Sequence, residues 1–164
     1  MNDLNDLEKM LSDIFKKYPD IVEEESEKVL ALIVTRLQGD VVQGTPVGVG
    51  GSAGLRGSIF GEVRRAGNRM YGIVGSPLEY APIVEQGRKP GPVSVKGRQS
   101  IELWVRRVLG ISSAESSSVA FLVARKVAMK GFDGAFMFQE AWDMNLSWIE
   151  QQLQSIPQRV FNRL

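Results

Sequence analysis

The sequence predicts an α+β fold, in which a small sheet and its loops are wrapped by helices. Before residue 45 and after residue 99, apolar residues recur at the three- and four-residue steps of amphipathic helices. Between them lies a turn-rich run and then a short β-like pair, Leu55–Arg65 and Met70–Gly75. We expect a single domain over residues 1–164, with a helical segment at 1–44, sheet and loops at 45–98, and a helical segment at 99–164.

The composition excludes several kinds of chemistry. The 164 residues are 43% hydrophobic and 24% charged, which suits a buried core rather than broad disorder. The chain has no cysteine and no histidine, which excludes disulfides, thiolate metal sites and the commonest general base. No apolar run approaches the roughly 20 residues of a membrane helix, and the acidic start does not resemble a signal peptide. We therefore expect a soluble intracellular protein with no metal or cofactor.

The N-terminal segment carries two helical stripes separated by a proline. Pro19 lacks an N–H donor and disfavours helical geometry at Tyr18, so a long helix is kinked there or a second helix starts with Pro19 in its first turn. Gly44 suits the end of the second helix. The first stripe comprises Leu4, Leu7, Leu11, Ile14, Phe15 and Tyr18, and the second Val29, Leu30, Ile33, Leu37 and Val41. A metal site is not expected at Glu23, Glu24, Glu25 and Glu27, which mostly face different ways around the helix.

The glycine-rich run from Thr45 to Gly54 contains matches to three functional motifs. Gly50–Gly54 fits the G-x-S-x-G nucleophile elbow around Ser52, but that chemistry needs a base, almost always histidine. Gly48–Ala53 fits G-x-G-x-x-A without a strand–turn–helix context, and Arg56-Gly57-Ser58 lacks the lysine and the spacing of a phosphate loop. We interpret all three as accidents of a flexible glycine loop.

Residues 58–75 predict a β-hairpin with its turn at Ala66–Arg69. Tyr80–Gln86 predicts a short helical turn, with Pro82 near its start and Gly87 after its end. For Glu85, a solvated charge or a local ion pair is favoured over a catalytic role. A brief strand is expected at Val93–Val95.

Helical patterns dominate the rest of the chain. Gln99–Leu109 has Ile101, Trp104, Val105 and Val108 on one side and ends at Gly110. Ser112 and Glu115 form a capping-box pattern for a helix that runs to about Lys130. In that helix Val119, Leu122, Val123 and Val127 should point inward, and Ala120, Ala124 and Ala128 permit close packing. After an apolar loop at Gly131–Phe138, a final helix carries Trp142, Leu146, Ile149 and Leu153, and Pro157 ends or bends it. We interpret Trp142 and Trp148 as packing residues.

The charge is unevenly distributed. Residues 1–40 carry a net charge of −5, residues 41–130 carry +8, and residues 131–164 carry −2. A basic middle segment could mark a face for nucleic acid or for an acidic partner. Complementary packing between subunits or segments is the simpler interpretation.

Two short runs, in this order, resemble a known family. The first is Pro46-Val47 followed by Leu55-Arg56-Gly57-Ser58-Ile59, and the second is Tyr80-Ala81-Pro82-Ile83-Val84-Glu85-Gln86-Gly87. Ala124–Val127, Lys130-Gly131, Phe136–Phe138 and Ala141 extend the pattern, which spans roughly Thr45 to Ala141. It is similar to that of tail completion, or head–tail joining, proteins of long-tailed bacteriophages, often labelled minor tail or neck components. The departures are the long Gly48–Gly54 run, where family members often have Asp-Thr-Gly, and Gly134-Ala135, where they often have Arg-Pro.

The resemblance implies an α+β fold, with a small, mainly antiparallel sheet packed against the long N-terminal helix and the C-terminal helices. It implies a non-enzymatic virion protein of the tail or neck, present in the host cytoplasm during assembly. Such a protein forms a ring with itself, expected to be a hexamer, at the head-proximal end of the tail, although the free protein can be a monomer. The ring would meet the head connector or stopper on one side and the tail tube or tail terminator on the other. DNA would pass through it with only non-specific contacts, and no membrane is involved.

Two sets of residues are candidates for these contacts, because exposed glycine-rich loops can order on binding and basic side chains can face DNA. The partner-interface candidates are Gly48, Gly50, Gly51, Ser52, Gly54, Glu85, Gly87, Arg88 and Lys89, and the DNA-lumen candidates are Arg64, Arg65, Arg69, Lys96 and Arg98. The alternative from another class is a small non-enzymatic nucleic-acid-binding module that uses the basic middle segment. A hydrolase that uses Ser52 ranks far below both.

Overall fold

The computed structural model describes residues 8–9, 12–14, 16–48, 54–67 and 69–164. Contacts divide the chain into two compact units, the first comprising Met1–Leu37, Gly61–Val74 and Trp142–Leu164, and the second Gln38–Phe60 and Gly75–Ala141. The long helices α2 (Pro19–Gly44) and α7 (Met137–Gln154) each have residues in both units. Helices dominate the described residues and the strands form two small sheets, so the α+β class is confirmed. The single domain stays a prediction.

Helix α2 is the main helix of the first unit. It begins at Pro19 and ends at Gly44, so the sequence-based bounds are confirmed, and Pro19 occupies the first turn of a new helix. Its predicted inward residues Val29, Ile33 and Leu37 are all buried. The stripe that precedes Pro19 falls largely outside the described residues, since Leu4, Leu7, Leu11 and Phe15 are not among them.

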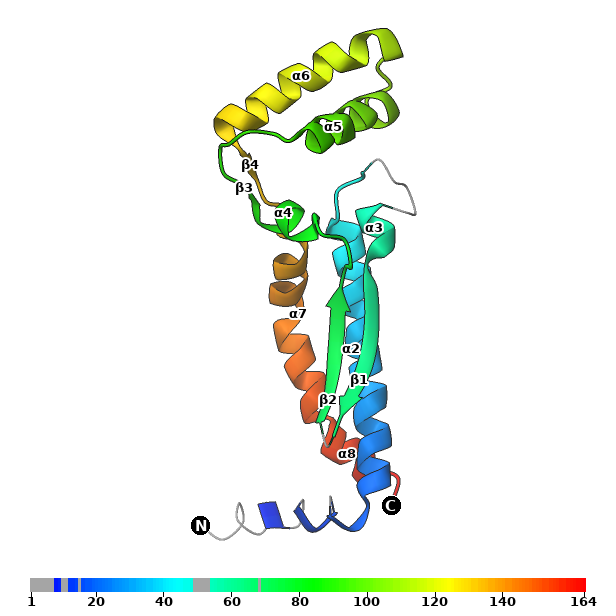
Figure 1. The fold of residues 1–164 in the computed structure, drawn as a ribbon. Coiled ribbons are helices and arrows are strands. Elements are labelled where there is room, and N and C mark those ends of the chain that lie inside the picture. The colour runs from blue at the N-terminus through cyan, green and yellow to red at the C-terminus, as the bar shows by residue number, and fades with distance from the viewer. Residues whose placement is uncertain (1–7, 10–11, 15, 49–53, 68) are drawn as a thin grey trace. The chain divides into compact units, whose positions relative to one another are not determined.

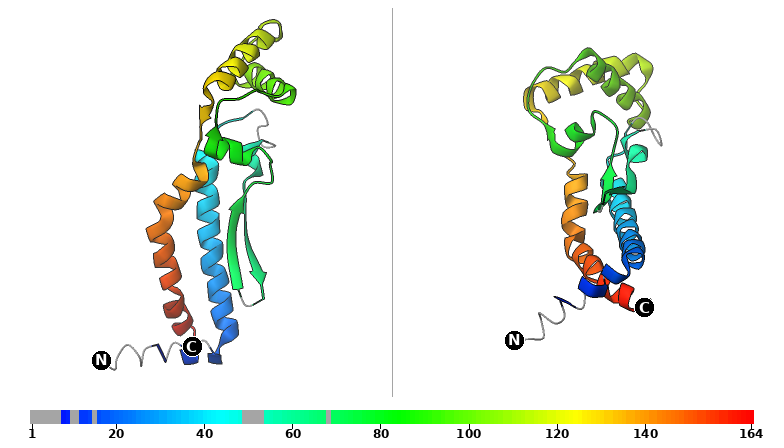
Figure 2. Two further views of the ribbon diagram at one scale, coloured as in Figure 1. Left: turned by 60° about the vertical axis from the view of Figure 1, so that its left-hand side comes forward. Right: turned by 60° about the horizontal axis from the view of Figure 1, so that its bottom comes forward.

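A two-stranded hairpin and α7 pack beside α2 in the first unit. Strands β1 (Phe60–Ala66) and β2 (Arg69–Gly75) pair as neighbours and run in opposite directions (Figure 1). Gly72 lies so close to α2 that a Cβ there would be 2.7 Å from Val34 Cγ2. On α7, the Trp148 ring lies 4.3 Å from the Arg36 guanidinium carbon. Figure 2 shows the two neighbours of α2 from further directions.

The predicted apolar stripe of the last helix is only partly buried. Ile149 is buried, but Trp142, Leu146 and Leu153 are exposed, so the expectation that Trp142 packs in the core is wrong. The helix instead turns Ala141 and Asn145 inward, together with half-buried Trp148. It stops at Gln154, and Pro157 falls in the first turn of a separate short helix, α8 (Ile156–Phe161).

The second unit contains short elements and a pair of packed helices. Its short elements are α3 (Leu55–Ser58), α4 (Ala81–Gln86), β3 (Gly87–Arg88) and β4 (Phe132–Asp133). Its longer helices are α5 (Val95–Val108) and α6 (Ser113–Lys130), which pack on each other, with Val105, Ala120 and Ala124 buried. Strands β3 and β4 pair antiparallel, with Gly87 opposite Asp133 and Arg88 opposite Phe132. None of the described helices has both the length and the apolar character needed to cross a membrane.

Several sequence-based expectations for the second unit are wrong. Leu55–Ser58 is a helical turn rather than the start of a strand, because the Ser58 N–H donates to the Gly54 carbonyl at 3.0 Å. The strand expected at Val93–Val95 is absent, since Ser94 caps α5 by accepting from the Gly97 N–H at 3.1 Å. The loop expected to reach Phe138 contains β4 and ends where α7 begins at Met137.

Helix α6 has the predicted bounds but a different inner face. The small residues Ser116, Ala120 and Ala124 are buried, whereas Leu122, which was expected to point inward, is exposed. Small side chains at four-residue steps let the two helices approach closely, and the bulky residues are then left on the outer face. At the helix start, the Ser112 hydroxyl donates to the Glu115 carboxylate at 3.1 Å, so the two capping-box side chains bond to each other.

Candidate functional site

The ends of the glycine-rich run are joined by an arginine. The Arg56 guanidinium donates to the Thr45 carbonyl from Nε at 3.1 Å and from Nη2 at 2.6 Å. Thr45 is fully buried, and its hydroxyl donates to the Val41 carbonyl at 2.6 Å at the end of α2. These bonds fix where the run leaves α2 and where it enters α3. Within the first resembling run, Arg56 therefore has a structural role.

Glu85 anchors the start of α7. Its carboxylate accepts from the Phe138 N–H at 3.1 Å and from the Gln139 N–H at 3.0 Å. These two groups belong to the first turn of α7, whose N–H groups have no partner within the helix. The residue before the helix, Phe136, has no side-chain acceptor and has a positive φ of 48°. Glu85 is thus a helix cap supplied from 53 residues earlier, instead of the solvated charge or local ion pair that we expected.

Glycines allow the backbones of β3 and β4, which lie next to this cap, to approach each other closely. Gly87 has a φ of 77°, and a Cβ there would be 2.5 Å from the Phe132 carbonyl oxygen and from the Gly134 nitrogen. A Cβ on Gly131, where φ is 70°, would overlap the Arg88 carbonyl oxygen. Only glycine fits such positions without displacement of the backbone. We call α4, β3, β4 and the first turn of α7 the junction.

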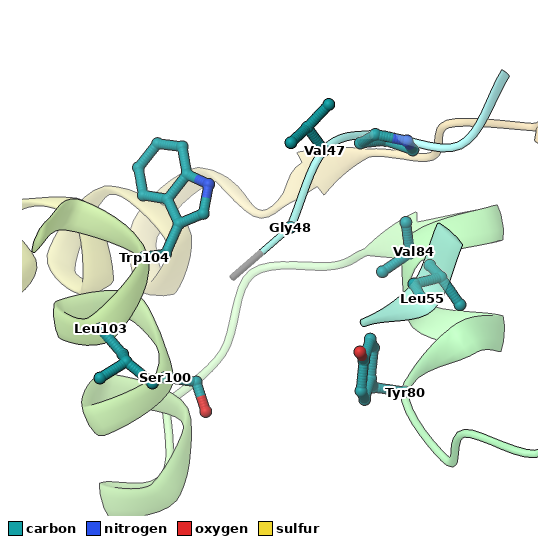
Figure 3. Close-up of a pocket in the computed structure, with 9 residues that line it drawn as sticks. Val47, Gly48, Leu55, Tyr80, Val84, Ser100, Leu103 and Trp104 are labelled. Atoms are coloured by element: carbon teal, nitrogen blue, oxygen red, sulfur yellow. The ribbon is translucent and has the colours of Figure 1, made fainter. Parts of the chain in front are cut away.

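An apolar pocket of about 350 Å³ lies beside the junction, within the second unit (Figure 3). In the close-up, Trp104, Leu103 and Ser100 on α5 lie on one side of the space, and residues of α3 and α4 lie on the other. The described lining residues include no charged side chain and are Pro46, Val47, Gly48, Leu55, Tyr80, Val84, Ser100, Leu103 and Trp104. Such a lining suits an apolar group better than acid–base chemistry.

The acidic start of α2 forms an ion-pair cluster in the first unit. Lys28 contacts Glu24 at 2.9 Å and Glu25 at 3.0 Å, and Arg163 contacts them at 2.8 and 2.9 Å. The Lys28 hydrogen bond is the main reason that the pKa of each carboxyl lies below its ordinary value, with Arg163 adding to the effect. The same contacts raise the pKa of Lys28 and of Arg163. Among the described residues, no three potential acidic ligands gather in a way that could hold a metal ion.

The described members of the predicted partner-interface set differ in exposure and in structural role. Gly50, Gly51 and Ser52 lie outside the described residues, so the G-x-S-x-G interpretation is not tested. Gly48 is exposed beside the pocket and Lys89 is exposed after β3, whereas Gly54 is buried. Glu85 and Gly87 belong to the junction, and Arg88 donates from its guanidinium to the Pro92 carbonyl. Gly87 and Arg88, which we expected in an exposed loop, therefore form strand β3.

The predicted DNA-lumen residues fall in both units. Arg64 pairs with Glu62, and Arg65 pairs with Glu23 on α2. Arg69 is exposed at the start of β2, near the hairpin turn. Lys96 and Arg98 are exposed in the first turns of α5, in the second unit. Sequence reasoning missed the structural roles of Glu85 and Arg56, because each depends on a contact distant in sequence.

Comparison with known proteins gives one match. Residues 9–87 match the family model described as "Bacteriophage HK97-gp10, putative tail-component". No curated protein and no solved structure matches the chain. The matched residues contain α2, the glycine-rich run, the hairpin and α4 with Glu85. The match confirms the resemblance found in the sequence, because residues 9–87 are similar to a family of tail components of long-tailed bacteriophages.

Proposed function

We propose that this protein is a virion structural protein that completes the phage tail and joins it to the head. In this proposal several copies form a ring at the head-proximal end of the tail, and the ring docks on the head connector. The observation that carries the proposal is the match of residues 9–87 to a family of bacteriophage tail components. The order of the two resembling runs supports the narrower role in head–tail joining.

The chemistry of the described residues supports a role in binding rather than in catalysis. Glu85, which directly follows the lining residue Val84, already accepts two backbone N–H groups. The pocket itself is lined by apolar and hydroxyl side chains, which suits an apolar side chain of a connector or tail protein. Gly48 and Val47, at the edge of the pocket, are the residues that we propose for that contact.

The nucleic-acid alternative is less well supported. Arg64 and Arg65, two of its main cations, pair with carboxylates and would have to exchange these partners for phosphates. A module of this kind should bind DNA at low salt and lose affinity steeply as salt is added. Absence of binding by the purified protein at low salt would eliminate this alternative.

The joining role is tested by deletion of the gene from the parent phage or prophage, followed by electron microscopy of the lysate. Filled heads and separate tails that never join would support the proposal, and tails of uncontrolled length would indicate tail termination instead. Normally joined virions would refute it. Complementation with the wild-type gene is the positive control. Complementation with Ser52→Ala should succeed equally, whereas a hydrolase that uses Ser52 would fail.

A further inference from the structure

Helix α7 carries a second apolar face that the chain leaves exposed. Trp142, Leu146 and Leu153 follow one another at helical spacing and are 49%, 40% and 42% exposed. Asp143 and Glu150 are exposed on the same side of the helix, next to this stripe. Helix α7 contains three acidic residues and no lysine or arginine. We call this surface the acidic α7 face.

Helix α6 carries a comparable face of the opposite charge. Phe121, Leu122 and Met129 are 57%, 61% and 65% exposed, on the side opposite the small residues that pack against α5. Arg125 lies between them and Lys126 at their edge, both exposed. The segment from Val95 to Lys130, which contains α5 and α6, has a net charge of +5. We call this surface the basic α6 face.

The two faces are similar in length and in apolar character, and they are opposite in charge. From Trp142 to Leu153 the α7 stripe runs about 16 Å, and from Phe121 to Met129 the α6 stripe runs about 12 Å, at 1.5 Å per residue. Large apolar side chains grouped on a helix face mark interaction sites. An acidic border on one face and basic side chains on the other favour their mutual contact and disfavour contact of either face with its own copy.

We propose that the acidic α7 face of one copy docks on the basic α6 face of the next copy. This inference rests on the proposed function, because it takes neighbouring copies as the partners. One chain supplies both complementary faces, so the contact is head-to-tail, and head-to-tail contacts close into rings when the rotation permits. A membrane is a poorer occupant because the α7 face is acidic, and DNA is a poorer occupant of the α6 face because Phe121, Leu122 and Met129 surround its central arginine.

Cysteine cross-linking tests this contact, because the chain contains no cysteine of its own. Leu122→Cys is made in a tagged copy and Leu146→Cys in an untagged copy, and the two are mixed and treated with a short bis-maleimide. Gln151→Cys, exposed on another side of α7, replaces Leu146→Cys as the matched control. The reaction is run on the concentrated purified proteins and on tails recovered from infected cells.

The expected result is a tagged–untagged product several times more abundant with Leu146→Cys than with Gln151→Cys. Arg125→Glu in the tagged copy should lower the yield about three- to tenfold, and Asp143→Lys with Glu150→Lys in the other copy should restore it. Equal yields at both α7 positions, or failure of the charge exchange to restore the product, would overturn the inference. A link formed only within one chain that carries both cysteines would also overturn it. If tails contain the protein but not this cross-link, the contact is refuted and the proposed function is not. If tails lack the protein, the proposed function is refuted, and the cross-linking of the purified proteins then tests the contact.

Discussion

Replacement of Glu85 by alanine should destabilise α7 without changing any residue of that helix. The Glu85 carboxylate satisfies two N–H groups of the first turn, those of Phe138 and Gln139. Phe136 precedes the helix and offers only an aromatic ring. In the variant, the two N–H groups would depend on water, and the positive end of the helix dipole would lose its counter-charge.

The size of the effect follows from two contributions. Loss of a capping side chain costs about 0.5–2 kcal/mol, and loss of a carboxylate at a helix N-terminus costs about 0.3–1 kcal/mol. Glu85 is half-buried and Gln139 is exposed, so water compensates for part of the loss. We expect Glu85→Ala to lower the free energy of unfolding by about 1–2.5 kcal/mol. Glu85→Gln should cost about half as much, because the amide keeps one acceptor oxygen but loses the charge.

Urea denaturation followed by far-ultraviolet circular dichroism and tryptophan fluorescence measures these differences. The matched control is Glu79→Ala, which removes an exposed carboxylate six residues earlier and should leave the free energy of unfolding within about 0.5 kcal/mol of wild type. If Glu85→Ala were as stable as Glu79→Ala, the cap would not exist in solution. If Glu85→Gln were as unstable as Glu85→Ala, the charge alone would matter and the hydrogen-bond argument would be wrong.

Three further predictions concern other parts of the fold. Gly131→Ala should destabilise the protein by several kcal/mol more than Gly110→Ala in urea denaturation, because both glycines have a φ near 70° but only at Gly131 would the new Cβ meet backbone. Equal losses of stability in the two variants would show that the backbones of Gly131 and Arg88 do not approach each other closely. Arg36→Met should cost about 0.5–1 kcal/mol through loss of the contact with Trp148, and no loss in urea denaturation at low salt would contradict that contact. Because the folded-state pKa of Glu25 is below its unfolded value, its stabilisation is present above about pH 4.3 and is lost as pH falls through the folded value. Denaturation measured from pH 6 to pH 2 should therefore show a smaller acid-induced loss in Glu25→Gln, and an unchanged pH profile would refute the ion-pair argument.

Most helices could be located from the sequence because residues at or next to their ends, such as proline and glycine, mark where they begin and stop. Pro19 and Gly44 mark the bounds of α2, and Gly110 has the positive φ expected of a residue that follows a helix. The errors occurred where a tertiary contact decides the local structure. Leu55–Ser58 directly precedes the apolar Ile59 and Phe60 and was expected to begin the strand, yet the Arg56 bonds to Thr45 accompany a helical turn there. Val93–Val95 is rich in β-branched residues, but the cap from Ser94 starts α5 instead.

Burial was harder to predict than secondary structure. The stripe at Trp142, Leu146 and Leu153 has the spacing of a core face, but α7 turns Ala141 and Asn145 inward. Periodicity identifies an apolar face without identifying what covers it. The same limit applies to Leu122 on α6, which is exposed although its spacing suits the core. Side chains that a sequence assigns to the core and a single chain leaves exposed are therefore the natural places to search for contacts between copies.

Each of the two runs that carry the family resemblance contains a residue that stabilises the fold. In the first run, Arg56 joins the two ends of the glycine-rich segment, and in the second, Glu85 caps a helix that begins more than fifty residues later. Substitutions at either position are expected to act through stability, so loss of function in such variants would not identify a contact surface. Variants of the exposed faces on α6 and α7 should instead change the contact between copies and leave stability nearly unchanged. Arg125→Glu, for example, should leave the free energy of unfolding nearly unchanged while it weakens the proposed contact between copies, because exposed charges contribute little to folding. Parallel measurement of unfolding and cross-linking in Glu85→Ala and Arg125→Glu would therefore separate the residues that build this protein from those that assemble it.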